Sequence, residues 1–575
     1  MKKNKRLKRG ITRRQFMGSS ALGAVGASTL LSGVKFCKAT EPDVPNILLI
    51  FPDQLRPQAL ACYGNTDCST PNISALSNNG VTFDIACSTF PVCGPARASL
   101  MTGLFPHFNG VVDNPTAQDE YGNPILDENN QPIYKYQLEY MLDLDDDGIP
   151  ETGVPRMAKR LGNALYNTNP YTCTYVGKWH LGGYSLDLQK TNPLYLDFIT
   201  QEEYRHGYEY YLADTTEINH FTQQDYQECS YDRYWPCFKH GPNNTPMNKT
   251  YPVPWRTDYE KNTTKDAISI SPYPWFITYA SQAPHFPYYG QGTDPDEMPA
   301  QYFNMYDPAT LTLRPGADSF GFPQYPPCDP GPTLYGDDWY AYYYGYISWF
   351  DAMVGEIVTQ LKGIDIGGGK SLYDNTLIVF ASDHGIDLGC HNNFGKRSLY
   401  EESCRVPLIF GGGYIEENYP GRKGTRVTNI PVGLCDIFFT LADFAGTYIE
   451  DIRSVLHGDS MIDYVLTGTS ALNRDSVYME VLPTEHTGEG GDVPSRGIRT
   501  ATHKYIERGS EFDQDGKPTA VYSCDREIYD LVNDPYEQTN INDTAPIALI
   551  NNLKSKFDYW KTRTNDDWPN LSCEC

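Results

Sequence analysis

The chain has 575 residues, of which 40% are hydrophobic and 21% are charged, and its formal net charge at pH 7 is −26. That length is sufficient for a large hydrophobic core together with a second domain. Residues 1–39 contain ten of the 46 Lys and Arg residues and no acidic residue, so residues 40–575 carry a formal charge of −36. An acidic balance of this size argues against nucleic acid as a partner and favours a soluble exported protein.

Residues 1–39 have the pattern of a twin-arginine export signal. A basic stretch leads to Arg13 and Arg14, a mildly apolar run follows, and small residues precede a cleavage position after Ala39. A membrane anchor is the alternative, but glycines and serines interrupt the run, which is short for a bilayer span. No other segment of the sequence is long and apolar enough to cross a membrane. We therefore expect the twin-arginine export machinery as a partner, a periplasmic or secreted location, and no stable membrane anchor.

Four β-rich runs along the chain each lead into polar residues. Their continuous apolar character, clearest in NILLIF and TLIVFA, is typical of strands buried on both faces of a parallel sheet. The runs and the residues after them are 46–51 with Asp53 and Gln54, 171–176 with Lys178 and His180, 275–280 with His285, and 376–381 with Asp383 and His384. Because ligands of open α/β sheets bind beyond the carboxyl ends of the strands, we expect these polar residues to meet at one edge.

Each of these polar pairs has a structural interpretation when it is taken alone. Aspartates after strands commonly cap helices or turns, and a single histidine is usually hydrogen-bonded within the fold. Together, however, two carboxylates with amide and imidazole neighbours suit a divalent cation, while Lys178, His180 and His285 suit an anionic substrate. The set predicts a metal-assisted hydrolase of an anionic compound.

The stretch PVCGPARASLMTG, residues 91–103, places a cysteine at the predicted start of a helix. Pro95 suits the first turn of a helix, so Cys93 would lie at the positive end of the helix dipole, beside Arg97. That is a favourable position for an anion. On this short pattern alone, a purely structural cysteine is the favoured alternative.

Two other pairs of cysteines are close in sequence. Cys62 with Cys68, and Cys229 with Cys237, could form small disulfide loops in an oxidising compartment, although spacing does not fix connectivity. No C-x-x-C pair indicates a zinc or thioredoxin-like site.

Residues 93–103 resemble the signature of the formylglycine-dependent sulfatases, members of the alkaline phosphatase superfamily. Segments that resemble other motifs of that family follow in matching order, namely PNILLIFPDQ, GKWHLGG, APHFP and SDHG…GKRSLYEESCRVPLI. The tail EIYDLVNDPYEQTNI, residues 527–541, is similar to the C-terminal subdomain of the family, so the resemblance spans about residues 45–541. It implies a sulfatase, that is, a sulfuric ester hydrolase.

The resemblance implies an α/β fold with a large, mostly parallel sheet sandwiched by helices, as in alkaline phosphatase, and a smaller α+β C-terminal domain. We expect the sulfatase catalytic domain at residues 40–465 and the C-terminal subdomain at residues 466–575. In the subdomain, the runs VYMEVL, GIRTATHKYIER and REIYDLV predict strands, and residues 545–563 predict a packing helix.

In this family the signature cysteine is oxidised to formylglycine by a maturation enzyme, which implies the same change at Cys93. The hydrated aldehyde would attack sulfur with one hydroxyl and release sulfate by collapse of the other, which splits one displacement into two easier steps. By similarity, Arg97 would hold the modified side chain and Lys178 would contact it and the sulfate. His180 would be the base for the collapse, while His285 and Lys396 would bind sulfate and assist the leaving oxygen.

The resemblance also implies a metal site of Asp53, Gln54, Asp383 and His384, together with the modified Cys93. Many family members have aspartate at the position of Gln54 and asparagine at that of His384, so fewer fixed negative charges surround the metal here. The preference of hard cations for oxygen favours calcium, with magnesium and manganese as alternatives.

A long aromatic-rich segment between Gly183 and Trp275 bears on the substrate. Packing of its rings on one another is the structural alternative, whereas flat rings near the catalytic edge, with Arg205, Lys239 and His240, would suit sugars. Export agrees with a polymer that cannot enter the cell, so we expect a sulfated polysaccharide or its oligosaccharides as the sulfated carbohydrate substrate. A phosphonate or phosphate ester hydrolase of the same superfamily remains an alternative. A catalytically dead, secreted glycan-binding protein is the other.

Overall fold

The computed structural model describes residues 44–112, 157, 161, 167–178, 210–213, 253–285, 298–317, 338–450, 452–454, 456–470, 474–481, 494–509, 511–512, 518–520 and 526–568. All of them lie within one compact unit, Pro42–Cys575. The predicted export signal lies outside the described residues. Among the residues that the structure describes, no helix has the length and apolar character of a membrane span.

The main sheet has nine strands in the described part of the chain, in the order β10-β2-β9-β8-β1-β5-β3-β4, with β11 paired to β2. Its strands are β1 Asn46–Ile50, β2 Val81–Cys87, β3 Thr172–Gly177, β4 Tyr210–Ala213, β5 Trp275–Ala280, β8 Thr376–Ala381, β9 Arg405–Gly411, β10 Thr425–Val427 and β11 Val432–Gly433. Pairing is parallel throughout except where β9 lies antiparallel between β2 and β8. The prediction of a large, mostly parallel sheet is confirmed.

Side chains of successive strand residues point to opposite faces of the sheet, so the core has two layers. In β1, Ile47 and Leu49 face one layer, and Leu48 and Ile50 face the other. The first layer contains residues of α3 Cys93–Thr102 and α15 Leu434–Phe444, and the second contains residues of α2 Pro71–Asn78, α10 Val253–Ile270 and α12 Asp338–Gly363. Helices therefore cover both faces, which is why the strands read as continuous apolar runs.

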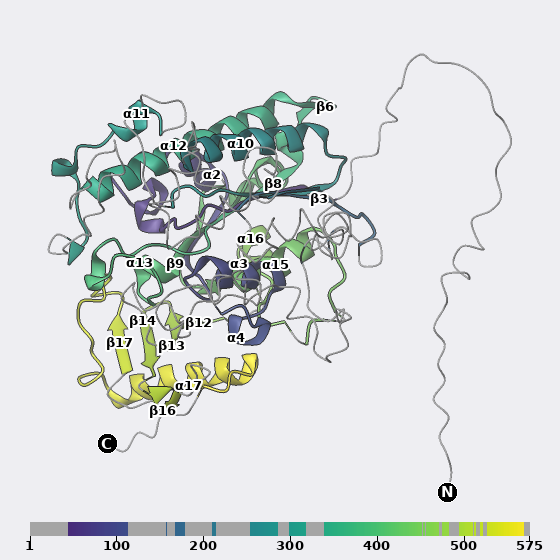
Figure 1. The fold of residues 1–575 in the computed structure, drawn as a ribbon. Coiled ribbons are helices and arrows are strands. Elements are labelled where there is room, and N and C mark those ends of the chain that lie inside the picture. Colours follow the sequence, from purple (N-terminus) through teal and green to yellow (C-terminus); the bar gives the residue numbers. More distant parts are fainter. Residues whose placement is uncertain are drawn as a thin grey trace, which may run out of the picture. The chain divides into compact units, whose positions relative to one another are not determined.

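A second, antiparallel sheet forms the C-terminal region, in the order β12-β13-β14-β17. Its strands are β12 Ser476–Val481, β13 Ser495–Thr500, β14 His503–Arg508 and β17 Arg526–Asp530. Helix α17, Ile547–Thr564, lies beside β13 and β14 (Figure 1). Its Leu553, Phe557 and Trp560 pack against Tyr478, Ile498 and Tyr505 of this sheet. These strands and the helix match the predicted runs within a few residues.

Shorter α-helices and β-strands lie between these elements. They are α4 Pro106–Asn109, α11 Ala300–Phe303, α13 Glu401–Cys404, α14 Gly413–Asn418, α16 Ile462–Leu466, the hairpin of β6 Asp365–Gly367 and β7 Lys370–Ser371, and the pair of β15 Glu511–Phe512 and β16 Pro518–Ala520.

The disulfide considered between Cys62 and Cys68 is not formed, because both thiols are free. Cys68 is buried, and its Sγ lies 3.7 Å from the carbonyl oxygen of Tyr344.

Candidate active site

The polar residues after β1 and β8 are joined by hydrogen bonds to one carboxylate. The backbone N–H of Gln54 and that of His384 donate to Oδ1 of Asp383, at 3.0 and 2.9 Å. The N–H of Asp53 donates to the carbonyl of Ser281, after β5, at 3.0 Å. The parallel strands β1, β5 and β8 therefore bring their carboxyl-terminal residues together, as the sequence predicts.

Gln54 is held in an unusual backbone conformation at this edge. Its φ is +65°, in the left-handed region that side chains other than glycine adopt rarely. The phenol of Tyr343 donates to the Gln54 carbonyl at 2.9 Å and accepts from the N–H of Arg56 at 3.1 Å. Such over-determined backbone strain is typical of functional sites.

Cys93 is the first residue of α3 and is fully buried. Its Sγ lies 3.1 Å from Nζ of Lys396 and 3.1 Å from Nε2 of His384. Nζ of Lys178 and Oδ1 of Asp53 each lie 3.7 Å away. The side chain of residue 93 thus stands where cations and one carboxylate converge at a helix N-terminus.

Arg97 lies one turn along α3 and bridges the two carboxylates. Its Nη2 contacts Oδ2 of Asp53 at 3.0 Å and Oδ2 of Asp383 at 2.9 Å. Its Nη1 donates to the carbonyl of Lys178 at 2.7 Å. Arg97 therefore fixes the two acids and the end of β3 relative to α3.

Lys178 and His285 follow β3 and β5 and approach the same carboxylate. Nζ of Lys178 is 2.7 Å from Oδ2 of Asp53, and Nε2 of His285 is 3.9 Å from its Oδ1. Both side chains are buried. Asp53 consequently has basic groups on both of its oxygens.

Lys396 is carried by a tight turn that Asp387 organises. The carboxylate of Asp387 accepts from Nδ2 of Asn393 at 2.6 Å and from the hydroxyl of Ser398 at 3.0 Å. The Asp387 N–H donates to the carbonyl of Gly395 at 2.8 Å. This fully buried aspartate positions the turn, and no feature of the sequence motifs had singled it out.

Protonation in the cluster follows from burial and neighbouring charge. Burial opposes ionisation of Asp53, but the positive charge of Lys178 holds its pKa well below the usual range. Burial and the charge of Asp53 oppose ionisation of Cys93, yet Lys178 and Lys396 lower its pKa well below that of an ordinary thiol. Burial, and then the negative charge of Asp53, raises the pKa of Asp383 to about 6. The centre thus stabilises negative charge at residue 93 and holds two acids that repel each other.

The donor set fits a divalent cation. Ligand atoms of Asp53, Cys93, Asp383 and His384 lie within 4.8 Å of one another, and all four residues are buried. Both amide atoms of the buried Gln54 lack a hydrogen-bond partner among the described residues. A buried amide without a hydrogen-bond partner destabilises the fold. A cation would be coordinated by the Gln54 amide oxygen and would offset the repulsion between Asp53 and Asp383.

Nine of the predicted site residues therefore lie in one cluster: Asp53, Gln54, Cys93, Arg97, Lys178, His285, Asp383, His384 and Lys396. His180 lies outside the described residues, as do Arg205, Lys239 and His240. The sequence reasoning missed the positioning residues Arg56, Tyr343 and Asp387. Two of them lie close to predicted site residues in the sequence, Arg56 two residues after Gln54 and Asp387 three residues after His384, and this closeness could have indicated them.

The fold and this centre define the class: an α/β protein of the alkaline phosphatase type with a buried centre of carboxylate, imidazole and cationic side chains. The sulfatase family model matches residues 45–447, and a model described as N-sulphoglucosamine sulphohydrolase, C-terminal, matches residues 389–563. The chain therefore belongs to the sulfatase family and is a sulfuric ester hydrolase.

Curated relatives agree with this assignment, and a solved structure shares the fold. The chain is similar to an ulvan-active sulfatase of Formosa agariphila, with 26% identity over 92% of this chain and 83% of the relative. It is also similar to an endo-4-O-sulfatase of Bacteroides thetaiotaomicron, with 24% identity over 92% of this chain and 94% of the relative. The fold is shared with the phosphonate monoester hydrolase of Agrobacterium radiobacter, at a TM-score of 0.61, 21% identity, and coverage of 90% and 96% of the two chains.

Proposed function

We propose that this protein is a formylglycine-dependent sulfatase that removes sulfate from a sulfated polysaccharide or its oligosaccharides. The observation that carries the proposal is the setting of Cys93, whose Sγ lies 3.1 Å from Lys396 Nζ and from His384 Nε2 at the start of α3. An unmodified thiol could attack sulfur, but it has no second hydroxyl with which to release the sulfate. A formylglycine-generating maturation enzyme is therefore a required partner.

The side chains around residue 93 have distinct roles in this proposal. The hydrated formylglycine would supply one hydroxyl as the nucleophile and the other for release of sulfate. Lys178 and Lys396 would bind sulfate oxygens and stabilise the charge that develops on them. His285 would assist the departing alcohol oxygen, and His180 would accept the proton of the second hydroxyl. Arg97 would act by holding Asp53 and Asp383.

Asp53, Gln54, Asp383 and His384 would hold a divalent cation next to residue 93. When bound, the cation would polarise the attacking oxygen and offset charge on the sulfate. A donor set made mainly of oxygens favours calcium, with magnesium or manganese as alternatives. His384 Nδ1 lies 2.7 Å from the carbonyl of Gly385, which leaves Nε2 as the ligand atom.

The proposal of a carbohydrate substrate has two supports. Of the two curated relatives named above, one is an ulvan-active sulfatase and the other an endo-4-O-sulfatase, and a third, of Bacteroides thetaiotaomicron, is an N-acetylglucosamine-6-O-sulfatase. The export pattern of residues 1–39 agrees with a polymer outside the cytoplasm, so we propose a periplasmic or secreted enzyme. We also propose a catalytic domain at residues 40–465 and a C-terminal subdomain at residues 466–575.

Mass spectrometry of the peptide that ends at Arg97 tests the mechanism. We expect active protein to carry an aldehyde at residue 93, detectable by its reaction with a hydrazide. Full activity of protein that holds only the thiol would refute the proposal.

A comparison of sulfate and phosphonate esters of one alcohol separates the two ester classes. We expect a higher kcat/KM for the sulfate. A panel of sulfated polysaccharides and a simple aryl sulfate then tests the substrate class. A clear preference for the aryl sulfate over every polysaccharide would contradict it.

A further inference from the structure

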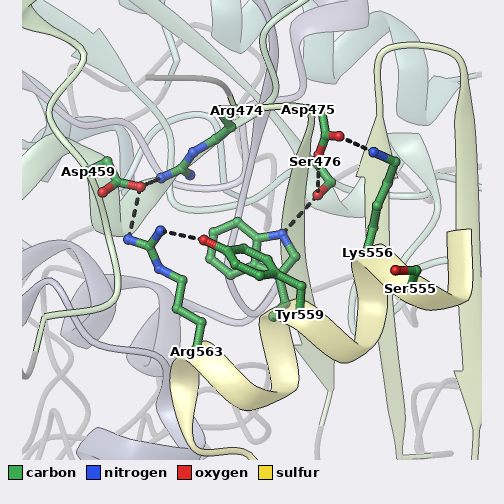
Figure 2. Close-up of a pocket in the computed structure, with 9 residues that line it drawn as sticks. Asp459, Arg474, Asp475, Ser476, Ser555, Lys556, Tyr559 and Arg563 are labelled. Atoms are coloured by element: carbon green, nitrogen blue, oxygen red, sulfur yellow. Dashed lines mark hydrogen bonds and ion pairs between the residues drawn. The ribbon is translucent and has the colours of Figure 1, made fainter. Parts of the chain in front are cut away.

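A cavity of about 400 Å³ lies between α17 and the start of β12 (Figure 2). Its size is within the range of small-molecule binding sites. It is lined by Asp459, Arg474, Asp475, Ser476, Ser555, Lys556, Tyr559, Trp560 and Arg563. None of these residues belongs to the active centre.

Three cationic side chains and two carboxylates line this cavity, which will be called the α17 cavity. Nη1 of Arg474 contacts Oδ2 of the buried Asp436 at 2.8 Å, and its Nη2 is paired with Asp459. Nη2 of Arg563 contacts Oδ2 of the same Asp459 at 2.9 Å. One carboxylate thus fixes two guanidinium groups side by side, as Figure 2 shows.

Lys556 adds a third positive charge at the cavity and is paired with Asp475 (Figure 2). With Asp436 behind Arg474, three cations and three carboxylates meet at the cavity, so its charges balance in a chain whose formal net charge is −26. A polyanion is repelled by most of such a chain, so a region without net negative charge is a favoured place for it to bind.

Two aromatic rings complete the α17 cavity. Trp560 is buried, its ring centre lies 5.1 Å from the guanidinium carbon of Arg474 and 5.3 Å from that of Arg563, and its Nε1 donates to Ser476 Oγ at 3.0 Å. Tyr559, by contrast, is 57% exposed. Its hydroxyl accepts from Nη1 of Arg563 at 3.3 Å, which orients the exposed ring beside the charges.

We propose that the α17 cavity is an auxiliary binding site for a sulfated saccharide unit. A sulfate group matches the guanidinium and ammonium donors of Arg563 and Lys556. Sugar hydroxyls match the mixed acceptors and donors of Asp459, Asp475 and the two serines, and the C–H face of a sugar ring packs on an exposed aromatic ring such as Tyr559. This inference rests on the proposed substrate class, because the ligand would be another part of the polymer that the active centre desulfates.

An auxiliary site has a specific kinetic consequence. A polymer held at the α17 cavity presents its other units to the active centre at a raised local concentration, whereas a small sulfate ester gains nothing. Loss of the cavity should therefore raise KM for a polymer and leave hydrolysis of an aryl sulfate unchanged.

Binding is measured with full-length protein in which Cys93→Ala prevents turnover, with ulvan, chondroitin sulfate and ι-carrageenan as probes. The test variants add Tyr559→Ala with Arg563→Gln, or Lys556→Gln alone. Lys556 is paired with the exposed Asp475, so its replacement should not prevent folding. This single variant keeps the test valid if the double variant does not fold. The matched control adds Tyr448→Ala with Arg453→Gln, which removes an equally exposed tyrosine and an exposed arginine elsewhere.

We expect both test variants to weaken binding of at least one sulfated probe, by about fivefold or more for the double variant, and to leave binding of its desulfated form unchanged. The control should bind as the parent does. Equal affinities of the parent, test and control variants for every probe would overturn the proposal, and so would a parent that binds none of them.

Turnover by protein with Cys93 intact separates this inference from the proposed function. If the test variants bind a probe weakly but wild-type protein never desulfates it, the cavity is a binding site and the proposed substrate is wrong. If wild-type protein desulfates a probe whose binding and KM the variants leave unchanged, the proposed function stands and the auxiliary site is refuted.

Discussion

The active centre and the cluster around Lys504 are both built from buried charges, but they differ in how those charges are paired. Nζ of Lys504, on β14, lies 2.7 Å from Oε1 of Glu537 and 3.0 Å from Oε1 of Glu401. Glu401 also contacts Nε of Arg499 at 3.2 Å, and its N–H donates to Oε2 of Glu537 at 2.7 Å. Nη1 of Arg405 contacts Oε2 of Glu401 at 3.7 Å as well, so three cations pair with two acids and join α13 to the C-terminal sheet.

The active centre is open by comparison. Nζ of Lys396 and Nζ of Lys178 lie 3.1 and 3.7 Å from Sγ of Cys93, and the Gln54 amide has no hydrogen-bond partner among the described residues. A cluster whose charged and polar groups all have partners, here called closed, gains little from a ligand. A cluster with groups that lack partners, here called open, is stabilised by a cation at the acids and an anion at the lysines. The unpartnered Gln54 amide and the lysines gathered at residue 93, rather than burial or charge itself, therefore distinguish the candidate site from a structural contact.

The largest effect is expected from Cys93→Ala. This change removes the group that becomes the nucleophile, so activity should fall by at least about 10³-fold. Stability should change much less, because the packing of α3 does not depend on ion pairs of the thiol. The measurements are turnover of a sulfate ester and thermal unfolding of the same sample. Residual activity above about a tenth of wild type would refute the role of residue 93.

Removal of the metal should give the next largest effect. Thorough chelation, verified by elemental analysis, should abolish turnover and lower Tm, because a cation that binds only the folded state stabilises it by about 2.7 kcal/mol at 100 times its Kd. Calcium should restore both properties. Gln54→Glu adds a charge to the donor set and should tighten calcium binding as measured by calorimetry. An unchanged Tm and unchanged activity after verified removal would exclude a functional cation.

The same substitution at two buried lysines tests the contrast directly. Lys504→Met leaves Glu401 and Glu537 without their shared cation, so the free energy of unfolding should fall by about 3–5 kcal/mol, with little loss of kcat per folded molecule. Lys396→Met removes one of three neighbouring cations, so it should cost less stability and reduce kcat by at least about 10²-fold. Denaturant unfolding and active-site titration measure both. The reverse pattern would show that the Lys504 cluster, not the open one, is functional.

The sequence predicted the active centre but not the cluster around Lys504. The apolar runs at residues 46–51 and 376–381 fixed two central strands, and with them the edge where Asp53 and Asp383 meet, because the carboxyl ends of parallel strands coincide. Motif order assigned ten residues to one site, and the nine of them that the structure describes lie in one cluster, while His180 lies outside the described residues. The Lys504 cluster had no signal, because its members come from segments far apart in the chain and their ion pairs depend on tertiary packing.

Positioning residues were also hidden from sequence reasoning. The left-handed backbone of Gln54 and the contact of Tyr343 with its carbonyl arise only when α12 packs on the sheet. The free thiols of Cys62 and Cys68 show the opposite error, since closeness in sequence suggested a bond that packing does not make.

The smallest effect is expected at another buried cluster, around His107. Nδ1 of His107, on α4, lies 2.6 Å from Oε2 of Glu480, and its Nε2 lies 3.0 Å from the carbonyl of Thr564 at the end of α17. Burial opposes protonation, but Glu480 raises the pKa of His107. Burial, and then the positive charge of His107, lowers the pKa of the neighbouring His457 to about 3.

His457 should therefore make the protein less stable as the pH falls below about 6.5, its ordinary pKa. Between pH 6.5 and 3 the unfolded chain binds a proton at this residue that the folded protein does not, so the free energy of unfolding falls by about 1 kcal/mol per pH unit on acidification. Nδ1 of His457 accepts from the N–H of Phe105 at 3.1 Å, and the amide oxygen of asparagine can accept the same bond. His457→Asn should keep stability at pH 7 within about 1 kcal/mol of wild type and flatten its fall between pH 6.5 and 4.5. Urea unfolding at several pH values measures the slope, and equal slopes for the two proteins would show that His457 is not held neutral by the fold.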